Sequence, residues 1–340
     1  MNGVARPLLS RVADSVYWMG RYMERAENIA RFIGVNLNLQ LDLPLDPTRQ
    51  WQPLIDTSGD TEVFKERYGD ATQESVVSFL AYDAENPNSI YSCLTSAREN
   101  ARSVRETISS EMWEQVNSMY LQIKSQREMP NPEWLPEVFR GIRLGSHMFQ
   151  GLTDATMTHN EAWHFTKLGR NMERADKTSR ILDVKYFMLL PSVSDVGTPY
   201  DDIQWSAVLR SVSGFEMYRK KYGRITPRDI VEFLVLDRDF PRSVHHSIRS
   251  ADESLHAITG APLGSYKYPS EQHMGLLRSE LDFTSVEFII RQGIHEYLDG
   301  LQVKMNMIDS SVANDFVART PREPSQTPAQ TQTQTQAGSR

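Results

Sequence analysis

The chain carries one helical signature twice, about 150 residues apart. The first copy reads Gly-Arg-Tyr-Met-Glu-Arg-Ala-Glu from Gly20 to Glu27, and the second reads Gly-Arg-Asn-Met-Glu-Arg-Ala-Asp from Gly169 to Asp176. Six of the eight positions are identical, and the last keeps its negative charge. A repeat on this scale constrains the fold more than any other feature, because each copy must form the same kind of unit.

A second match between the halves runs without a gap at an offset of 154 residues. Between Gln50 and Asn100, 15 of 51 positions are identical to the stretch that begins at Gln204. We therefore predict a first repeat over residues 1–158 and a second over residues 159–317. Residues 318–340 are rich in Gln, Thr and Pro and have little apolar surface to bury, so they are expected to form a disordered tail.

Apolar residues recur at helical spacing throughout both halves. From Val12 to Leu37 they follow alternating steps of four and three residues, and the second copy keeps the register from Phe165 to Leu182. No segment alternates convincingly as a strand would. We predict an all-α fold, a helical bundle of two tandem, pseudo-symmetric repeats with about four helices each. One helix is expected to run from Ile90 to Met112, and a loop to cover Leu41–Asp60.

Composition narrows the class of protein. The net charge is −7, which argues against a nucleic-acid binder. No apolar run approaches the roughly 20 residues that a transmembrane helix needs, and the first residues lack the apolar core of a signal peptide. A single cysteine, Cys93, excludes an intramolecular disulfide framework. We expect a cytoplasmic protein that binds neither nucleic acid nor a membrane.

The charged face of the duplicated helix is the first candidate site. It has stayed fixed while the apolar stripe diverged, since Val16 corresponds to Phe165 and Ala30 to Ser179. A solvated face would drift more readily, so these charges are expected either to face a ligand or to form an ion-pair network between the halves; the sequence leaves both open. The residues are Arg21, Glu24, Arg25 and Glu27 in the first copy and Arg170, Glu173, Arg174 and Asp176 in the second.

Further arginines are candidates for binding an anion. Arg98 and Arg102 share one helix face, and guanidinium groups donate paired hydrogen bonds to carboxylates and phosphates. Arg242 follows a proline at a predicted helix start, where its counterpart in the first half is Asn88. A solvated basic face is the alternative for the first pair.

Catalytic and metal-binding motifs were also sought. Glu161 and His164 have the spacing of a di-metal carboxylate bundle, but the first copy lacks the second such motif. No nucleotide-binding loop or hydrolase signature is present. We therefore predict no metal and no cofactor, leave the catalytic residues unknown, and expect no stand-alone catalytic activity.

The motifs together resemble the Alpha-E family of helical bacterial proteins, which is defined by a Glu-Arg motif in tandem duplication. The resemblance rests on residues 9–28, including Ser-Arg-Val-Ala-Asp-Ser and Tyr-Trp-Met-Gly-Arg, on residues 86–102 and 109–113, and on Phe240–Val244. It covers roughly residues 8–315. Such proteins are encoded beside circularly permuted ATP-grasp ligases and transglutaminase-like proteins, which implies a role in peptide synthesis or modification.

The resemblance favours one function and leaves two alternatives. The leading hypothesis is an accessory or binding subunit that acts with the ATP-grasp ligase, the transglutaminase-like protein or a peptide. One alternative is an enzyme in which Glu24 or Glu173 is a general base and the arginines clamp an anionic substrate. The other is a purely structural, homo-oligomeric scaffold.

Overall fold

The computed structural model describes residues 8–42, 47–129, 131–188 and 199–317. Within these ranges every regular element is helical and no strand occurs, which confirms the predicted all-α class. No helix in the described part of the chain is long and apolar enough to cross a membrane. The predicted disordered tail, residues 318–340, lies outside the described residues.

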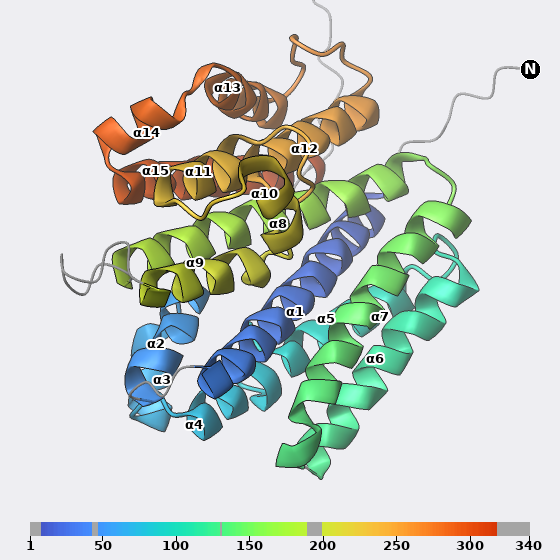
Figure 1. Ribbon diagram of the computed structural model, residues 1–340. Coiled ribbons are helices and arrows are strands. Elements are labelled where there is room, and N and C mark those ends of the chain that lie inside the picture. Colours follow the sequence, from blue (N-terminus) through green and yellow to red (C-terminus); the bar gives the residue numbers. More distant parts are fainter. Residues whose placement is uncertain (1–7, 43–46, 130, 189–198, 318–340) are drawn as a thin grey trace, which may run out of the picture.

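The helices follow one another through short connections (Figure 1). In the first half the α-helices are α1 (Ser10–Asp42), α2 (Pro47–Ser58), α3 (Thr61–Tyr68), α4 (Gln73–Val77), α5 (Ile90–Ser103), α6 (Ser110–Glu128) and α7 (Leu135–Thr156). In the second half they are α8 (Glu161–Met188), α9 (Pro199–Ser211), α10 (Phe215–Tyr222), α11 (Pro227–Val231), α12 (Val244–Thr259), α13 (Pro269–Phe283), α14 (Val286–Gln292) and α15 (Ile294–Val312). The short helical turns are η1 (Ser78–Tyr82), η2 (Pro132–Trp134), η3 (Glu232–Leu236) and η4 (Ala313–Val317).

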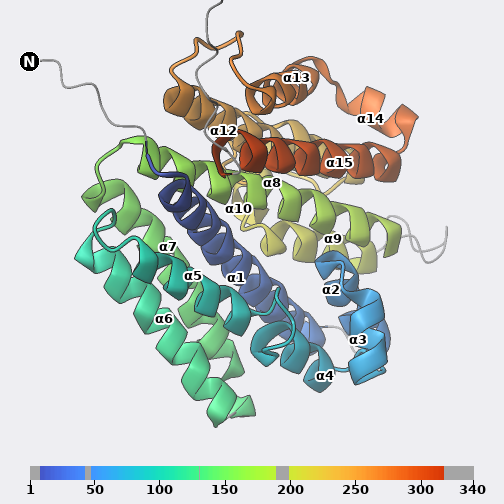
Figure 2. The same ribbon diagram turned by 180° about the vertical axis from the view of Figure 1, so that it is seen from behind.

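The two motif helices, α1 and α8, lie side by side at the centre of the molecule (Figures 1 and 2). Helices α5 and α7 pack on α1, and α12 and α15 pack on α8. The motif glycines make the close approach possible. A Cβ atom on Gly20 would collide with the carbonyl oxygen of Thr166, and one on Gly169 with that of Tyr17. The glycine of each copy therefore lets the backbone of the other motif helix come near.

The predicted apolar stripes face the interior. Val16, Met19 and Ala30 of α1 and Leu168 of α8 are buried. They belong to one continuous core that extends through both predicted repeats. The predicted boundary between residues 158 and 159 falls in the turn between α7 and α8. The division into two domains stays a prediction, because the core does not separate there.

Segments that match at the offset of 154 residues share local structure. The hydroxyls of Thr72 and Thr226 cap α4 and α11, and each of these helices continues directly into a π-helical turn, η1 or η3. Ser89 and Ser243 then cap α5 and α12 in the same way, each accepting a hydrogen bond from the backbone three residues on. Asn88 and Arg242 each lie one residue before these caps, so they occupy equivalent positions in the two halves.

Two details of the predicted helix pattern are wrong. The apolar spacing continues past Val104, but α5 ends at Ser103 and a separate helix, α6, begins after Ser109, whose hydroxyl accepts from the Met112 amide. The expected loop at Leu41–Asp60 contains α2, which buries Trp51 in the core. The Ser109 cap marks the start of a separate helix, and the buried Trp51 belongs to a helix that packs on the core. Apolar periodicity alone revealed neither feature.

Candidate functional site

The glutamate of each motif helix is bound by the arginine of the other. Arg174 donates to Glu24 through Nε (2.9 Å to Oε1) and Nη2 (2.8 Å to Oε2). Arg25 donates to Glu173 through Nε (2.6 Å to Oε1) and Nη2 (2.9 Å to Oε2). Both carboxylates are buried. The duplicated motif thus forms two reciprocal, bidentate ion pairs between α1 and α8, the strongest geometry available to this pair of residue types.

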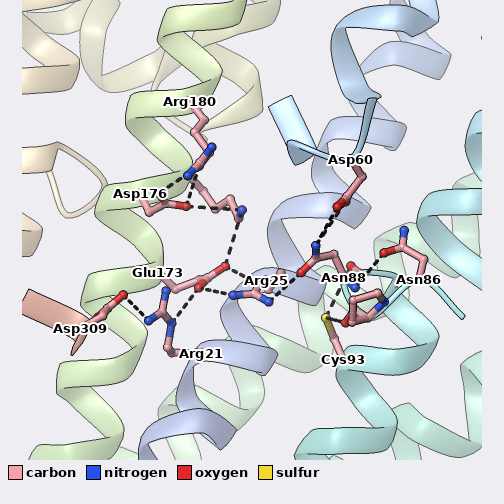
Figure 3. A network of polar contacts seen from close by, with 12 residues as sticks. Arg21, Arg25, Asp60, Asn86, Asn88, Cys93, Glu173, Asp176, Arg180 and Asp309 are labelled. Carbon is pink, nitrogen blue, oxygen red and sulfur yellow. Dashed lines mark hydrogen bonds and ion pairs between the residues drawn. The ribbon is translucent and has the colours of Figure 1, made fainter. Parts of the chain in front are cut away.

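The Glu173 pair extends toward α15 (Figure 3). Arg21 donates from Nε to Glu173 (2.9 Å) and from Nη1 to the carboxylate of Asp309. The Tyr17 hydroxyl donates to the other oxygen of Asp309 (2.6 Å). Burial, followed by the charge of Asp309, raises the pKa of Tyr17, so it stays a donor. The first motif helix is in this way tied to α15, the last α-helix of the described residues.

The same pair also reaches the loop before α5. Arg25 donates from Nη1 to the side-chain oxygen of Asn88 (2.8 Å), and Asn88 donates from its amide nitrogen to Asp60 (3.2 Å to each carboxylate oxygen). Figure 3 shows this chain of contacts from Glu173 through Arg25 and Asn88 to Asp60. Asn88 therefore bridges the guanidinium group of Arg25 in α1 and the carboxylate of Asp60 just before α3.

Asp176 closes the network on the α8 side. Its carboxylate accepts from Nε of Arg180 (2.9 and 3.0 Å) and lies 3.4 Å from Nζ of Lys177. Lys177 is in turn 3.8 Å from Glu173. The contact between Asp176 and Arg180, four residues apart, joins the cross-helix pair to the next turn of α8.

The Glu24 pair has different neighbours. Arg242 donates from Nη1 to Glu24 (2.9 Å) and lies 3.1 Å, through Nη2, from Glu27. Arg31 contacts the other oxygen of Glu27, and Gln150 of α7 donates to Glu24 (3.2 Å). Arg242, the counterpart of Asn88, thus inserts a guanidinium where the first half has an uncharged amide.

The electrostatics fix the protonation of both glutamates. Burial alone would raise the pKa of Glu24, but Arg174 and Arg242 outweigh it and lower the pKa to about 2. Burial opposes ionisation of Glu173 as well, and Arg25 and Arg21 hold its pKa well below the usual range. A carboxylate with so low a pKa is a poor general base near neutral pH. The geometry therefore gives the enzymatic alternative no support at these two residues.

The remaining predicted site residues lie outside these pairs. Arg170, the counterpart of Arg21, has its Nε buried without a hydrogen-bond acceptor among the described residues, and burial lowers its pKa. Arg98 donates to Asn117 (2.7 Å) and its guanidinium lies 4.8 Å from the ring centre of Tyr120. Arg102 is exposed and pairs with a glutamate on its own helix. The structure does not bring Arg98 and Arg102 to the Glu-Arg pairs.

Several members of the network were missed by sequence reasoning. Asp309, Asp60 and Gln150 lie outside the motif and carry no local signal, because only the packing of α15, α3 and α7 brings them in. Asn88 could have been found, since it aligns with Arg242 at the offset of 154 residues.

One cavity opens beside the network. Its volume is about 380 Å³, and it lies between the start of α1, α8 and α15. Arg21 and Asp309 form part of its wall together with Trp18 and Phe165. Among the described residues no group of three or more His, Cys, Asp or Glu side chains could hold a metal ion.

The helical architecture and the paired Glu-Arg motifs define a class of protein. A family model described as a predicted alpha-helical domain with a conserved ER motif matches residues 8–317. The chain belongs to this family, Alpha-E, as the sequence motifs implied.

Curated relatives come from mycobacteria. The uncharacterized protein Mb2597 of Mycobacterium bovis is 22% identical over 321 residues, and the uncharacterized protein Rv2567 of Mycobacterium tuberculosis is 21% identical over the same length. In each case the match covers 87% of this chain and 35% of the relative. The chain thus spans about a third of the length of these relatives. No solved structure matches it.

Proposed function

We propose that this protein is a non-catalytic, cytoplasmic helical subunit of a bacterial peptide synthesis or peptide-modification system, and that it acts by binding an ATP-grasp ligase. The observation that carries the proposal is the reciprocal burial of Glu24 and Glu173. The charged residues of the motif hold α1 and α8 together, so their role is to stabilise the fold of the subunit. The subunit would then function by binding its partner through its surface.

The state of the motif residues supports a non-catalytic role. Each glutamate is ionised and is bound by at least two basic side chains. A general base must reach a proton of the substrate and have a pKa near the working pH. Glu24 and Glu173 meet neither requirement, because both are buried between helices and have depressed pKa values.

The mycobacterial relatives support action beside another protein. The matched region is about a third of each relative, so in those proteins the domain shares a polypeptide with other sequence. When two domains are fused in one protein, separate proteins that carry the same two domains commonly act together. The resemblance to Alpha-E implies which kinds these are, a circularly permuted ATP-grasp ligase and a transglutaminase-like protein, with a peptide as their shared substrate.

The test is co-purification of this chain with a circularly permuted ATP-grasp protein of the kind encoded beside Alpha-E proteins, followed by size-exclusion chromatography with light scattering. ATP consumption by the ligase is then measured with a peptide substrate, with and without this chain. Serum albumin at the same concentration controls for crowding. We expect a stable complex and a changed rate of ATP consumption.

Other outcomes would reject the proposal in different ways. If no complex forms and the rate of ATP consumption is unchanged, the ATP-grasp ligase is not the partner of this chain. Turnover of a peptide by this chain alone, lost in Glu24→Gln or Glu173→Gln while folding is retained, would establish the enzyme. A discrete homo-oligomer that neither binds the ligase nor alters its rate would favour the scaffold.

A further inference from the structure

The two Glu-Arg clusters differ in their balance of charge. Around Glu173, the four cationic side chains face four carboxylates, one of them reached through Asn88 (Figure 3). The cations are Arg21, Arg25, Lys177 and Arg180, and the carboxylates are Glu173, Asp176, Asp309 and Asp60. This cluster is neutral as it stands.

The cluster around Glu24 is not neutral. Its carboxylates are Glu24 and Glu27, and both are buried. Three guanidinium groups contact them, those of Arg31 of α1, Arg174 of α8 and Arg242 before α12. The charge of Arg143 of α7 acts on Arg31, and Arg170 of α8 acts on Glu24 but is offset by Asp154, so the excess is two positive charges. The difference arises partly because the second half has Arg242 where the first half has the uncharged Asn88.

The guanidinium groups of Arg31 and Arg143 have donors without an acceptor. The Nε atoms of Arg31 and Arg143 are buried, and neither has a hydrogen-bond acceptor among the described residues. Burial, and then the charges of Arg242 and Arg143, lower the pKa of Arg31. Arginine nevertheless stays protonated in proteins, so a bound anion would stabilise its charge at this position.

The excess charge reaches the surface along α7. His147 lies one turn after Arg143, and about half of its side chain is exposed (48%). Its Nε2 is 3.9 Å from Glu27. Burial, followed by the charges of Arg242 and Arg31, lowers the pKa of His147 to about 4, so the ring is neutral near pH 7 and can still donate a hydrogen bond. An anion could therefore approach from solvent beside His147 and meet the arginines beneath.

We propose that the surface between α1, α7 and the start of α12 is a binding site for a phosphate-type dianion, bounded by Arg31, Arg143, His147 and Arg242. The excess of two positive charges matches one phosphoryl group, which carries nearly two negative charges at neutral pH. Guanidinium groups suit its oxygens because they donate several hydrogen bonds in a plane. This site is independent of the proposed function, since it requires no partner protein.

The test uses the full chain and inorganic phosphate as the probe. Phosphate binding is measured by isothermal titration and by the thermal unfolding midpoint, at constant pH and ionic strength, with acetate as the monoanionic comparison. Arg143→Gln removes one unpaired donor. Arg140→Gln is the matched control, because Arg140 lies one turn earlier on α7, is exposed and pairs with Glu137.

We expect phosphate to bind and to raise the unfolding midpoint of the wild type and of Arg140→Gln. Arg143→Gln should weaken phosphate binding roughly tenfold or more. Without phosphate, Arg143→Gln should be at least as stable as the wild type, because it removes a repelling charge. That result would also show that lost binding is not lost folding.

The source of the phosphoryl group is distinguished by a second titration with ADP. Tighter binding of ADP than of phosphate, lost in Arg143→Gln, would identify a nucleotide, and equal binding would identify the free anion. Equal stabilisation by acetate and phosphate would overturn the proposal. So would phosphate binding that Arg143→Gln leaves unchanged.

Discussion

Glu24 of α1 accepts two hydrogen bonds from Arg174 of α8, and the same arrangement recurs with Glu173 and Arg25 in exchanged roles. Each motif helix therefore supplies the acid for one pair and the base for the other. Because all four partners lie at one helix contact, changes on either side should alter the same property, the free energy of unfolding.

Removal of one buried charge should be severely destabilising. Glu24→Gln leaves Arg174 without its carboxylate and leaves Arg242 with Glu27 alone, and breaking a buried pair in this way costs about 3–5 kcal/mol. Glu99→Gln is the matched control, because Glu99 pairs with Arg102 at the surface, where such pairs contribute at most about 1 kcal/mol. Urea unfolding followed by circular dichroism measures both. Similar losses in the two variants would contradict the structural role of the pair.

The motif glycine should not tolerate a methyl group. Gly20→Ala places Cβ against the carbonyl oxygen of Thr166, and overpacking of this kind costs about 1–3 kcal/mol or more. Gly34→Ala in the same helix meets no atom within 4 Å, and there alanine should stabilise by roughly 0.5–1 kcal/mol through its helix propensity. Thermal or urea unfolding should show that Gly20→Ala lowers the free energy of unfolding and that Gly34→Ala raises it. A neutral Gly20→Ala would mean that α1 and α8 lie farther apart.

Stability should fall in acid because of the depressed pKa of Glu24. The folded-state pKa is about 2, against an ordinary value of 4.5. The contribution of Glu24 to the free energy of unfolding is therefore fully present above pH 4.5 and is lost as the pH falls toward 2. Between these values the carboxyl binds a proton in the unfolded chain but not in the folded chain. Urea unfolding measured from pH 7 down to acid should show this loss. Glu24→Gln should have a shallower slope across that range, and an unchanged slope would contradict the assignment.

Phosphate should raise the pKa of His147. Burial and the charges of Arg242 and Arg31 hold it at about 4, and a bound dianion would favour the protonated ring. Titration of the ring proton by NMR, with and without phosphate, measures the shift. The exposed His159 on the turn after α7 is the internal control. A His147 titration that ignores phosphate would oppose an anion beside Arg143.

The sequence predicted the helical class and the importance of the charged face, because period and duplication are local properties. It also allowed an ion-pair network between the halves, which the pairs of Glu24 and Glu173 form. The choice between that network and a ligand site depended on distance between helices, which no pattern in one copy encodes. Arg98 and Arg102 illustrate the limit, since correct helical spacing placed them on one face of α5 but gave no information on its distance from α1.

Other parts could not be predicted for different reasons. Asp309 enters the network from a helix nearly 290 residues later than Arg21, and only tertiary packing joins them. Arg143 and His147 were overlooked because a single arginine and histidine on a polar helix face are usually solvated. Their meaning depends on the neighbouring charges of Arg31 and Arg242. Unpaired charge is a property of a cluster, so it becomes visible only once the cluster is assembled.

The reciprocal pairs have a consequence for how such a chain could arise. In an isologous dimer, residue i of one subunit meets residue j of the other, and j meets i across the two-fold axis. Glu24–Arg174 and Glu173–Arg25 follow this rule within a single polypeptide. A chain with one copy of the motif could form both pairs only with a second copy of itself. With both copies in one chain, the two sides of the contact need not be identical, and this chain has Asn88 on one side and Arg242 on the other.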